Sequence, residues 1–407
     1  MRICLILSAF IVLLFFNACK DEPPILPGLT KSKILILTYP DSASVKINNK
    51  ESDITPYFVQ DLDPGFFRFT FSKFSYLDTS IYHVVQRNVT DTVFVELREK
   101  PSYWWKVYDT SNSPLPTIYI TKISVDEQNN IWIGTRDDGL FKFKDSVFTL
   151  YNSSNSGIPN NHINDIYAEG NGILWIATTN GFVKFDGVDW TVFNYSNLRV
   201  PANNITSIAR DKNNILWLGT LNDGLIKFDG VEATVYDYSN SGIPLNNITT
   251  IDVDENNVKW IGTHGEGIAT YDGTKWKIYN SYFNDLLNSY VSKILSDRNG
   301  NIWIGTGDKA SGTHGGLSKF DGNTFTNYYP SENGVPGNYV YDLALDENGK
   351  LWIATDNGLA NFDGNKWKIF NISNSGLTSN FVTSVAIDLE QNKWVAAEAV
   401  AKYIGSK

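Results

Sequence analysis

The sequence has few of the residues from which disulfides and metal sites are built. Its 407 residues include 2 cysteines, 1 methionine and 4 histidines. Both cysteines, Cys4 and Cys19, fall within the first 19 residues, so we expect no disulfide and no metal-binding thiol in the mature chain. His162, His264 and His314 lack the close spacing of a metal-binding pair, and we therefore expect no metal site.

Positive charge and catalytic motifs are also scarce. The chain has 34 Lys and Arg against 44 Asp and Glu, a net charge of −10, which argues against a nucleic-acid partner. It has no Gly-x-Ser-x-Gly motif and no glycine-rich phosphate loop followed by lysine. Turns such as Asp346–Gly349 resemble half a calcium loop but lack its distal glutamate. We expect a non-enzymatic protein without a cofactor.

The chain does contain a short apolar motif that is centred on a tryptophan and recurs along the sequence. Successive copies are 43, 42, 43, 43, 49 and 42 residues apart. The recurring tryptophans are Trp132, Trp175, Trp217, Trp260, Trp303, Trp352 and Trp394. A period near forty residues indicates a propeller or a solenoid.

One copy, residues 205–247, shows what each repeat folds into. It contains four short runs rich in β-forming residues, which are Ile205–Ala209, Ile215–Thr220, Leu225–Phe228 and Thr234–Tyr236. Asn, Asp and Gly separate the runs, as in tight turns. Four antiparallel strands in one repeat make a propeller blade, and the period-two alternation excludes a helical solenoid. We interpret the repeated tryptophan as an apolar side chain packed between blades rather than as a ring on which a sugar stacks.

The two ends of the repeat region complement each other. Six copies are complete, whereas the seventh begins at Val382 and has only three strands. Residues Trp104–Tyr108 match the fourth strand of a blade and would complete the seventh. The sequence therefore predicts an all-β fold in which residues 100–407 form a seven-bladed β-propeller closed by an N-terminal strand, without open sheet edges.

These repeats resemble those of the two-component regulator propeller family. The matching segments in one copy are Asp297–Gly300, Trp303–Thr306, Gly316-Leu317, Phe320–Gly322 and Tyr328. The resemblance implies an extracytoplasmic sensor propeller of the kind that detects glycans. No kinase, receiver or DNA-binding segment follows the repeats in this sequence, so we expect any signal to pass to a separate signalling or transport protein.

The first 32 residues predict export and anchoring. Arg2 precedes an apolar run, Ile3–Phe16, which is too short to span a membrane and fits a signal peptide at residues 1–18. Ala18-Cys19 resembles a bacterial lipobox, which implies lipidation of Cys19 and an outer-membrane lipoprotein of the cell envelope, facing the periplasm or the cell surface. Lys20–Glu22 resembles a surface-export tag or is a plain solvated tether. Residues 19–32 are proline-rich and predict an extended linker.

Residues 33–99 predict a separate small β-sandwich. Its expected strands include Ile34–Thr38, Ser44–Ile47, Phe67–Phe71 and Thr92–Leu97. The pattern around Pro40, Thr55-Pro56 and Leu62–Gly65 resembles PEGA-type domains, which implies a spacer. We interpret this domain as a stalk.

Candidate ligand-binding residues fall into two groups. The innermost strand of most blades carries small hydroxyl side chains at its second and third positions, but four blades break this pattern. The exceptions are Lys122, Asn164, Asp165, Lys293, Tyr341 and Asp342. Charges near the axis of a ring need water or a ligand, because an isolated buried charge is unfavourable. These residues are either a wet channel rim or a polar ligand site.

The second group lies on loops. In a propeller the turns between second and third strands, together with the connectors between blades, share one face, here named the mouth face. The candidates on it are Arg136, Asp138, His264, Glu266, Lys309 and His314. The blade with the 49-residue spacing carries an extra stretch, Gly307–His314, which we expect to be a long irregular loop. Such a loop is either functional or the result of drift where the fold tolerates insertions.

Three functions remain open at the level of sequence. The first is a lipid-anchored recognition protein whose mouth face binds a glycan, peptide or protein partner. The second is a propeller enzyme of the streptogramin-lyase type, with His264, Glu266 and His314 as the catalytic candidates. The third is a scaffold held in an outer-membrane assembly.

Overall fold

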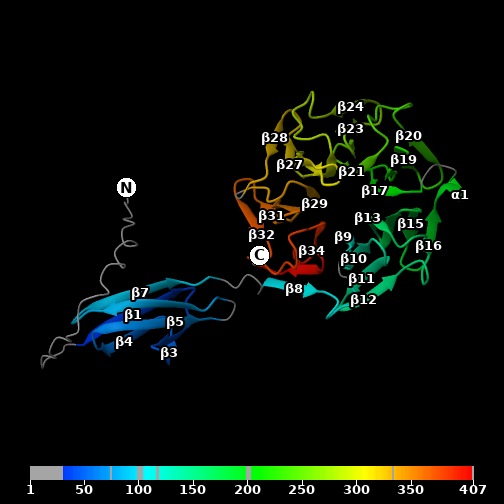
Figure 1. The fold of residues 1–407 in the computed structure, drawn as a ribbon. Helices are drawn as coiled ribbons and strands as arrows, with labels where there is room; N and C mark the ends of the chain where they lie inside the picture. The colour runs from blue at the N-terminus through cyan, green and yellow to red at the C-terminus, as the bar shows by residue number, and fades with distance from the viewer. Residues whose placement is uncertain are drawn as a thin grey trace. The chain divides into compact units, whose positions relative to one another are not determined.

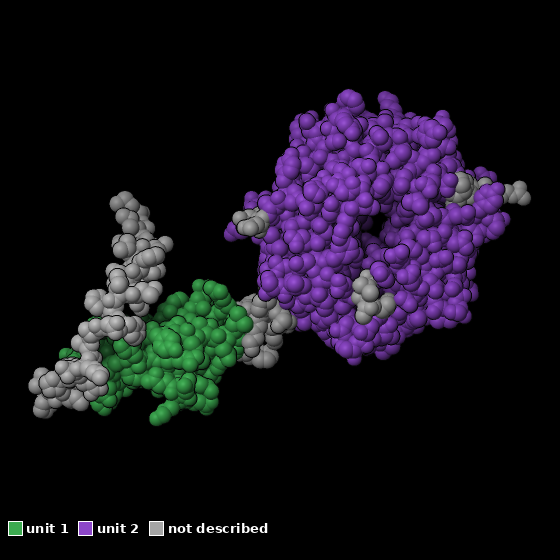
Figure 2. Space-filling model, in the orientation of Figure 1, with its two compact units in different colours: residues 1–100 green, residues 101–407 purple. Residues whose placement is uncertain are grey.

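The computed structural model describes residues 31–73, 76–98, 104–115, 119–198, 203–331 and 334–405. The predicted signal peptide, the lipidation site Cys19 and most of the predicted linker lie outside these residues. The chain divides into two compact units, residues 1–100 and 101–407 (Figures 1 and 2). The helix found in the described residues, α1 (Tyr195–Leu198), is four residues long. None of the described helical structure is long and apolar enough to cross a membrane.

The first unit is built from two β-sheets around one apolar core. One sheet has the order β4-β1-β7, with strands β4 (Tyr57–Leu62), β1 (Ser32–Tyr39) and β7 (Thr90–Glu96). The other has the order β3-β2-β5-β6, with strands β3 (Lys50–Ile54), β2 (Ser44–Ile47), β5 (Gly65–Ser72) and β6 (Thr79–Val85). Alternate residues of β1 are buried, and Ile34 and Ile36 pack with Phe69 and Phe71 of β5.

The second unit consists of four-stranded antiparallel sheets, each formed mainly by consecutive strands. Sheet 1 contains β9 (Ile120–Val125), β10 (Ile131–Thr135), β11 (Leu140–Lys144) and β12 (Val147–Tyr151). Sheet 2 contains β13 (Ile163–Gly170), β14 (Ile173–Thr178), β15 (Gly181–Phe185) and β16 (Trp190–Phe193). Sheet 3 contains β17 (Ile205–Arg210), β18 (Leu216–Thr220), β19 (Leu225–Phe228) and β20 (Ala233–Tyr236). Sheet 4 contains β21 (Ile248–Val253), β22 (Lys259–Thr263), β23 (Ile268–Tyr271) and β24 (Trp276–Tyr279).

The same pattern continues to the end of the chain. Sheet 5 contains β25 (Val291–Ser296), β26 (Ile302–Asp308), β27 (Thr313–Phe320) and β28 (Phe325–Tyr328). Sheet 6 contains β29 (Val340–Leu345), β30 (Leu351–Thr355), β31 (Gly358–Phe362) and β32 (Trp367–Phe370). Sheet 7 contains β33 (Ser384–Ile387), β34 (Lys393–Ala396), β35 (Val400–Tyr403) and β8 (Trp105–Tyr108). The sheets surround a central opening, so the unit is a β-propeller (Figure 2).

Each repeated tryptophan packs between neighbouring sheets, as the sequence analysis predicts. Trp132 of sheet 1, for example, packs against Ile163, Ile176 and Phe185 of sheet 2. The indole nitrogen of each tryptophan donates a hydrogen bond to an acidic residue six positions earlier, as Trp217 does to Asp211 at 3.0 Å. The other pairs are Trp132–Asp126, Trp175–Glu169, Trp260–Asp254, Trp303–Asp297, Trp352–Asp346 and Trp394–Asp388.

These acidic residues explain why the Asp-rich turns recur. In the third sheet the second carboxylate oxygen of Asp211 accepts hydrogen bonds from the backbone N–H groups of Asn213 and Ile215. One side chain therefore closes the turn between the first two strands and satisfies the buried indole nitrogen. The turns have a structural cause that does not involve calcium.

The N-terminal strand completes the last sheet, which confirms the expected pairing of the two ends. Strand β8 lies antiparallel to β35, with Tyr108 opposite Val400 and Trp105 opposite Tyr403. The N–H of Ile404 also donates to the carbonyl of Trp104 at 2.8 Å. Figure 1 shows this contact as the cyan strand β8 beside the red end of the chain.

Candidate functional site

The innermost strand of each sheet presents two successive side chains to the central opening. In sheet 3, Ile205 of β17 pairs with Thr220 and Ser207 pairs with Gly219, so Thr206 is an extra residue in the ladder. Such a β-bulge turns neighbouring side chains toward the same side. The inner strands of sheets 1, 2, 4, 5 and 6 show the same register shift.

The first of these two side chains ties each inner strand to the next one. The hydroxyl of Thr206 donates to the carbonyl of Ile248 in sheet 4 at 2.6 Å. The equivalent bonds are Thr121 to Ile163, Asn164 to Ile205, Thr249 to Val291, Ser292 to Val340 and Thr383 to Ile120. Tyr341 holds this position in sheet 6, and its ring instead packs edge-on against Phe381 at 5.0 Å between centroids.

The second of the two side chains accepts a hydrogen bond from a backbone N–H of the next inner strand. The hydroxyl of Ser207 accepts the backbone N–H of Ile251 in sheet 4 at 3.1 Å. Thr250 and Ser384 do the same for the N–H groups of Ile294 and Ile123. The carboxylates of Asp165 and Asp342 take this role toward Ile208 and Val385. The two aspartates predicted as ligand residues are therefore also part of the ring of inter-sheet bonds.

Lysine occupies this acceptor position twice, and a lysine ammonium group cannot accept a hydrogen bond. Lys122 in sheet 1 therefore leaves the backbone N–H of Ile166 in sheet 2 without this acceptor. In the same way, Lys293 in sheet 5 leaves the N–H of Leu343 in sheet 6 without one. Each bonds instead to the aspartate that precedes it in its own strand, Asp165 at 2.9 Å and Asp342 at 3.1 Å. Each aspartate therefore compensates for the lysine in the preceding sheet.

The lysine side chains meet one of these aspartates in the opening. Lys122 Nζ lies 2.8 Å and 3.0 Å from the two carboxylate oxygens of Asp342, and Lys293 Nζ lies 3.6 Å from one of them. Asp342 is 2% exposed. Burial alone would raise the pKa of Asp342, but Lys122 and Lys293 outweigh burial and hold that pKa below its ordinary range. Asp342, with Asp165, also outweighs burial at Lys293 and raises the pKa of this lysine.

The structure brings all six inner-strand candidates to one narrow cavity of about 100 Å³. Lys122, Asn164, Asp165, Lys293, Tyr341 and Asp342 all line it. Most of their polar groups already have partners within the protein. The cavity therefore resembles a charge-compensated channel more than an open site with groups waiting for a ligand.

Four of the six mouth-face candidates each lie against one aromatic ring. The Arg136 guanidinium is 5.2 Å from the centre of the Tyr119 ring, and Lys309 Nζ is 4.8 Å from that of Phe381. The His264 ring is 5.1 Å from Tyr290, and the His314 ring is 5.9 Å from Tyr339. These eight side chains are named the aromatic mouth.

The aromatic members of this group were missed by the sequence analysis. Tyr119, Tyr290 and Tyr339 each directly precede the first residue of an inner strand, and Phe381 lies three residues before β33. His162 holds the same place in sheet 2, where burial and the nearby Arg136 lower its pKa. A recurring ring at this place in the repeat is a signal that could have been found. The candidates named from the sequence are polar or charged residues, and Tyr341 is the one benzene-ring side chain among them.

The other two mouth-face candidates, Asp138 and Glu266, are exposed in tight turns. Their backbone N–H groups donate to the hydroxyls of Thr135 and Thr263, at 3.1 Å and 3.2 Å. Of the three proposed catalytic residues, His264 lies 3.4 Å from Asp308, while Glu266 and His314 contact other groups. No group of three His, Cys, Asp or Glu side chains in the described part of the chain is placed to hold a metal ion.

The extra stretch in sheet 5 is regular, so the expectation of an irregular loop is wrong. Strands β26 and β27 extend beyond those of the other sheets, and Asp308 pairs with Thr313 across the added turn. The Asp308 carboxylate accepts the N–H groups of Ala310 and Ser311 at 3.1 Å and 2.8 Å. A self-capped hairpin forms because this side chain satisfies the turn. It carries Lys309 and His314 to Phe381 of sheet 7 and Tyr339 of sheet 6.

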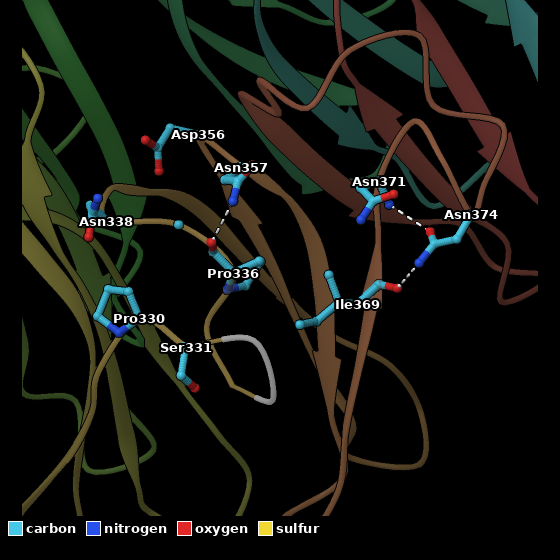
Figure 3. A pocket seen from close by; sticks show the side chains of 10 residues that line it. Pro330, Ser331, Pro336, Asn338, Asp356, Asn357, Ile369, Asn371 and Asn374 are labelled. Atoms are coloured by element: carbon cyan, nitrogen blue, oxygen red, sulfur yellow. Dashed lines mark hydrogen bonds between the residues drawn. The ribbon is translucent and has the colours of Figure 1, made fainter. Parts of the chain in front are cut away.

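A larger cavity, about 710 Å³, lies beside sheet 6, and Asp356 and Asn357 are among the residues that line it (Figure 3). In other connectors an asparagine caps the chain, as Asn246 accepts the N–H of Tyr238 at 2.9 Å. The matching donor position in this connector is Pro330, which has no N–H to offer Asn338. The connector also lacks the close approach that Gly242 makes to Trp276, since Gly334 lies against Ser331 instead. These two differences open the cavity.

Five segments of the chain match the two component regulator propeller family, at residues 114–137, 157–180, 199–222, 285–308 and 334–357. Each match ends just after one of the repeated tryptophan strands. The repeat type inferred from the sequence is therefore present in this chain. No curated protein matches the chain.

Solved structures with the same fold include an extracellular domain of a two component system and two lyases. The extracellular domain of a hybrid two component system from B. thetaiotaomicron has a TM-score of 0.61 and 23% identity, covering 73% of this chain and 41% of that chain. Streptogramin B lyase has a TM-score of 0.56 and 16% identity, covering 73% and 97%. Virginiamycin B lyase from Staphylococcus aureus has a TM-score of 0.55 and 14% identity, covering 73% and 98%. At these identities the likeness shows the propeller fold alone. This chain spans about two fifths of the length of the first of these proteins, 41%.

Removing the shared carboxylate tests the compensated channel. We expect Asp342→Ala to lower the free energy of unfolding by about 3–5 kcal/mol, because two lysines lose their counter-charge in a buried site. Urea unfolding measures this change, and Glu266→Ala on the exposed turn should change stability by at most about 0.5 kcal/mol. The depressed pKa of Asp342 makes its contribution complete above pH 3.8 and lost as pH falls through the folded-state pKa. The wild type and Glu266→Ala should therefore both show this acid-side loss, and Asp342→Ala should not. Equal stabilities of the two variants would contradict the assignment.

Proposed function

We propose that the protein is a non-enzymatic, lipid-anchored recognition protein of the cell envelope. In this proposal a seven-bladed propeller, carried by the N-terminal domain as a stalk, binds a glycan or a polar segment of a protein through the aromatic mouth. The observation that carries the proposal is the pairing of four rings with four cationic or imidazole side chains, all on turns, connectors and the extended hairpin of the mouth face.

The chemistry of the mouth suits a ligand with both apolar faces and hydroxyl or amide groups. Aromatic rings offer flat apolar area, and charged and polar side chains beside them fix orientation through hydrogen bonds. Sugar rings have this combination of a C–H face and a hydroxyl edge. The extended hairpin of sheet 5 supports the same reading, because it adds Lys309 and His314 to the mouth in one sheet alone.

The lysines and aspartates of the channel support this placement indirectly. Lys122 and Lys293 already share Asp342 as a counter-charge, so a ligand would gain little by displacing them. Recognition in the proposal therefore takes place at the mouth, and the channel charges serve mainly to hold the ring together. The match to regulator repeats and the fold shared with the extracellular domain of a two component system support a role in detecting ligands outside the cytoplasm.

Anchoring and signal transfer complete the proposal. The segment around Cys19 suits diacylation, which gives stable membrane attachment where a single chain would not. A separate signalling or transport protein would respond when the propeller has bound its ligand.

Ligand binding can be tested on an array of cell-wall and dietary oligosaccharides, followed by calorimetry on the glycans that bind. We expect Tyr119→Ala combined with Phe381→Ala to weaken binding about tenfold or more, because the ligand loses two ring faces. Tyr82→Ala, an exposed tyrosine of the first unit, is the matched control and should bind as the wild type does. A ligand that binds all three proteins equally would place recognition elsewhere.

Anchoring can be tested by fractionating cells that express the protein. We expect Cys19→Ala to move the protein from the membrane fraction to the soluble fraction, because the acylated residue is lost. Cys4→Ala changes the other cysteine, which lies inside the predicted signal peptide, and should leave the protein in the membrane. If Cys19→Ala stays membrane-bound, the anchor is not a lipid on this residue.

A further inference from the structure

A pair of facing lysines distinguishes the sheet that closes the ring. In sheet 7, Lys402 of β35 stands directly opposite Lys106 of β8. Every other sheet has at most one charged residue at this place between its third and fourth strands. The equivalent pairs are Lys142–Thr149, Lys184–Thr191, Lys227–Thr234, Thr270–Lys277, Lys319–Thr326 and Asn361–Lys368. The exception falls on the one seam that joins the two ends of the propeller.

Like charges directly opposite each other weaken a pair of strands. Within the described residues Lys106 has no carboxylate within 4.0 Å, and Lys402 has only Asp388, at 3.6 Å. Asp388 already accepts hydrogen bonds from Trp394 at 2.9 Å and from Asn392 at 2.9 Å. The positive charge at the seam is therefore only partly neutralised by the protein.

The two ammonium groups lie over a single stack of rings. Lys106 Nζ is 5.0 Å from the centre of the Tyr108 ring, and Lys402 Nζ is 5.2 Å from that of Trp394. These two rings stack on each other with centroids 5.7 Å apart and planes 13° apart. Because opposite residues of an antiparallel pair share a face, both ammonium groups lie on the same side of the sheet. The rings hold the two positive charges close together.

A cavity of about 500 Å³ lies beside this pair. Lys106, Lys144 and Lys402 line it, together with the polar side chains of Gln128, Asn129 and Ser146. Carboxylates also line it: Asp388 is occupied as described, Glu390 accepts a hydrogen bond from Asn392 at 3.2 Å, and Asp145 lies in the turn before β12. The turns that form this cavity lie at the end of the strands opposite the mouth face, so it is separate from the proposed glycan site.

We propose that this cavity binds an anionic group (sulfate, phosphate or carboxylate) between Lys106 and Lys402, and that the bound anion strengthens the pairing of β8 with β35. An anion supplies the negative charge that the seam lacks, and its oxygens accept hydrogen bonds from both ammonium groups. The pairing of β8 with β35 is then stabilised by an anion bound at the closing seam.

The test compares three proteins by thermal unfolding in sodium chloride, sulfate, phosphate and acetate at equal, low ionic strength. Lys106→Thr gives sheet 7 the Lys–Thr pair of the other sheets. Lys277→Thr removes a lysine from the same strand position of sheet 4, where its partner is Thr270, and is the matched control. Low ionic strength matters because salt screens the repulsion between exposed charges.

We expect Lys106→Thr to melt about 1–2 °C above the wild type in chloride, because the like-charge pair is gone. At least one of the three test anions should raise the melting temperature of the wild type and of Lys277→Thr beyond its value in chloride, and this excess should be lost in Lys106→Thr. The comparison between anions identifies the group that the cavity prefers. If the excess is equal in all three proteins, it reflects the general salting-out effect of the anion and the proposal is wrong. Lower stability of Lys106→Thr than of wild type in chloride would also overturn it.

Discussion

The propeller depends on hydrogen bonds between side chains and backbone that join each inner strand to the next. One side chain per strand donates to the neighbouring carbonyl, as Thr206 does to Ile248, and the adjacent one accepts the neighbouring N–H, as Ser207 does from Ile251. Because these groups are buried or partly buried, each unmade bond would cost about 1–3 kcal/mol. The bond from Thr383 to Ile120, between residues 263 positions apart, carries the pattern across the closing seam.

This requirement changes the meaning of charge near the axis. A lysine at an acceptor position leaves one backbone N–H of the next sheet without its partner, and an aspartate of that sheet accepts it instead. Asp165 does this for the N–H of Ile166, for which Lys122 of the preceding sheet provides no acceptor. The lysines then find their counter-charge in Asp342. Charged residues in the centre of a repeat ring can therefore arise from the geometry of the ring itself. The proposed function therefore assigns ligand recognition to the mouth, where side chains are not needed for closure.

The sequence predicted those parts of the fold that repeat. The tryptophan period gave the strands and sheets, and the unmatched segment Trp104–Tyr108 gave the closing strand. The predicted inner-strand residues do meet, because the repeat fixes their place in each sheet. Their partners could not be predicted, since the contact between Lys122 and Asp342 spans 220 residues and depends on how far each sheet turns around the axis. The hairpin at Asp308 was misjudged because a break in the repeat spacing does not reveal whether the added residues pair.

The central claim is that the propeller is closed by strand β8, and comparing two truncated proteins tests it most directly. One begins at residue 101 and keeps β8, and the other begins at residue 109 and lacks it. Loss of Trp105 and Tyr108, which are 8% and 7% exposed, removes two buried rings from the last sheet. The shorter protein should therefore melt about 10 °C or more below the longer one. Equal melting temperatures would mean that β8 does not close the ring, and the placement of the mouth and of the seam would lose its basis.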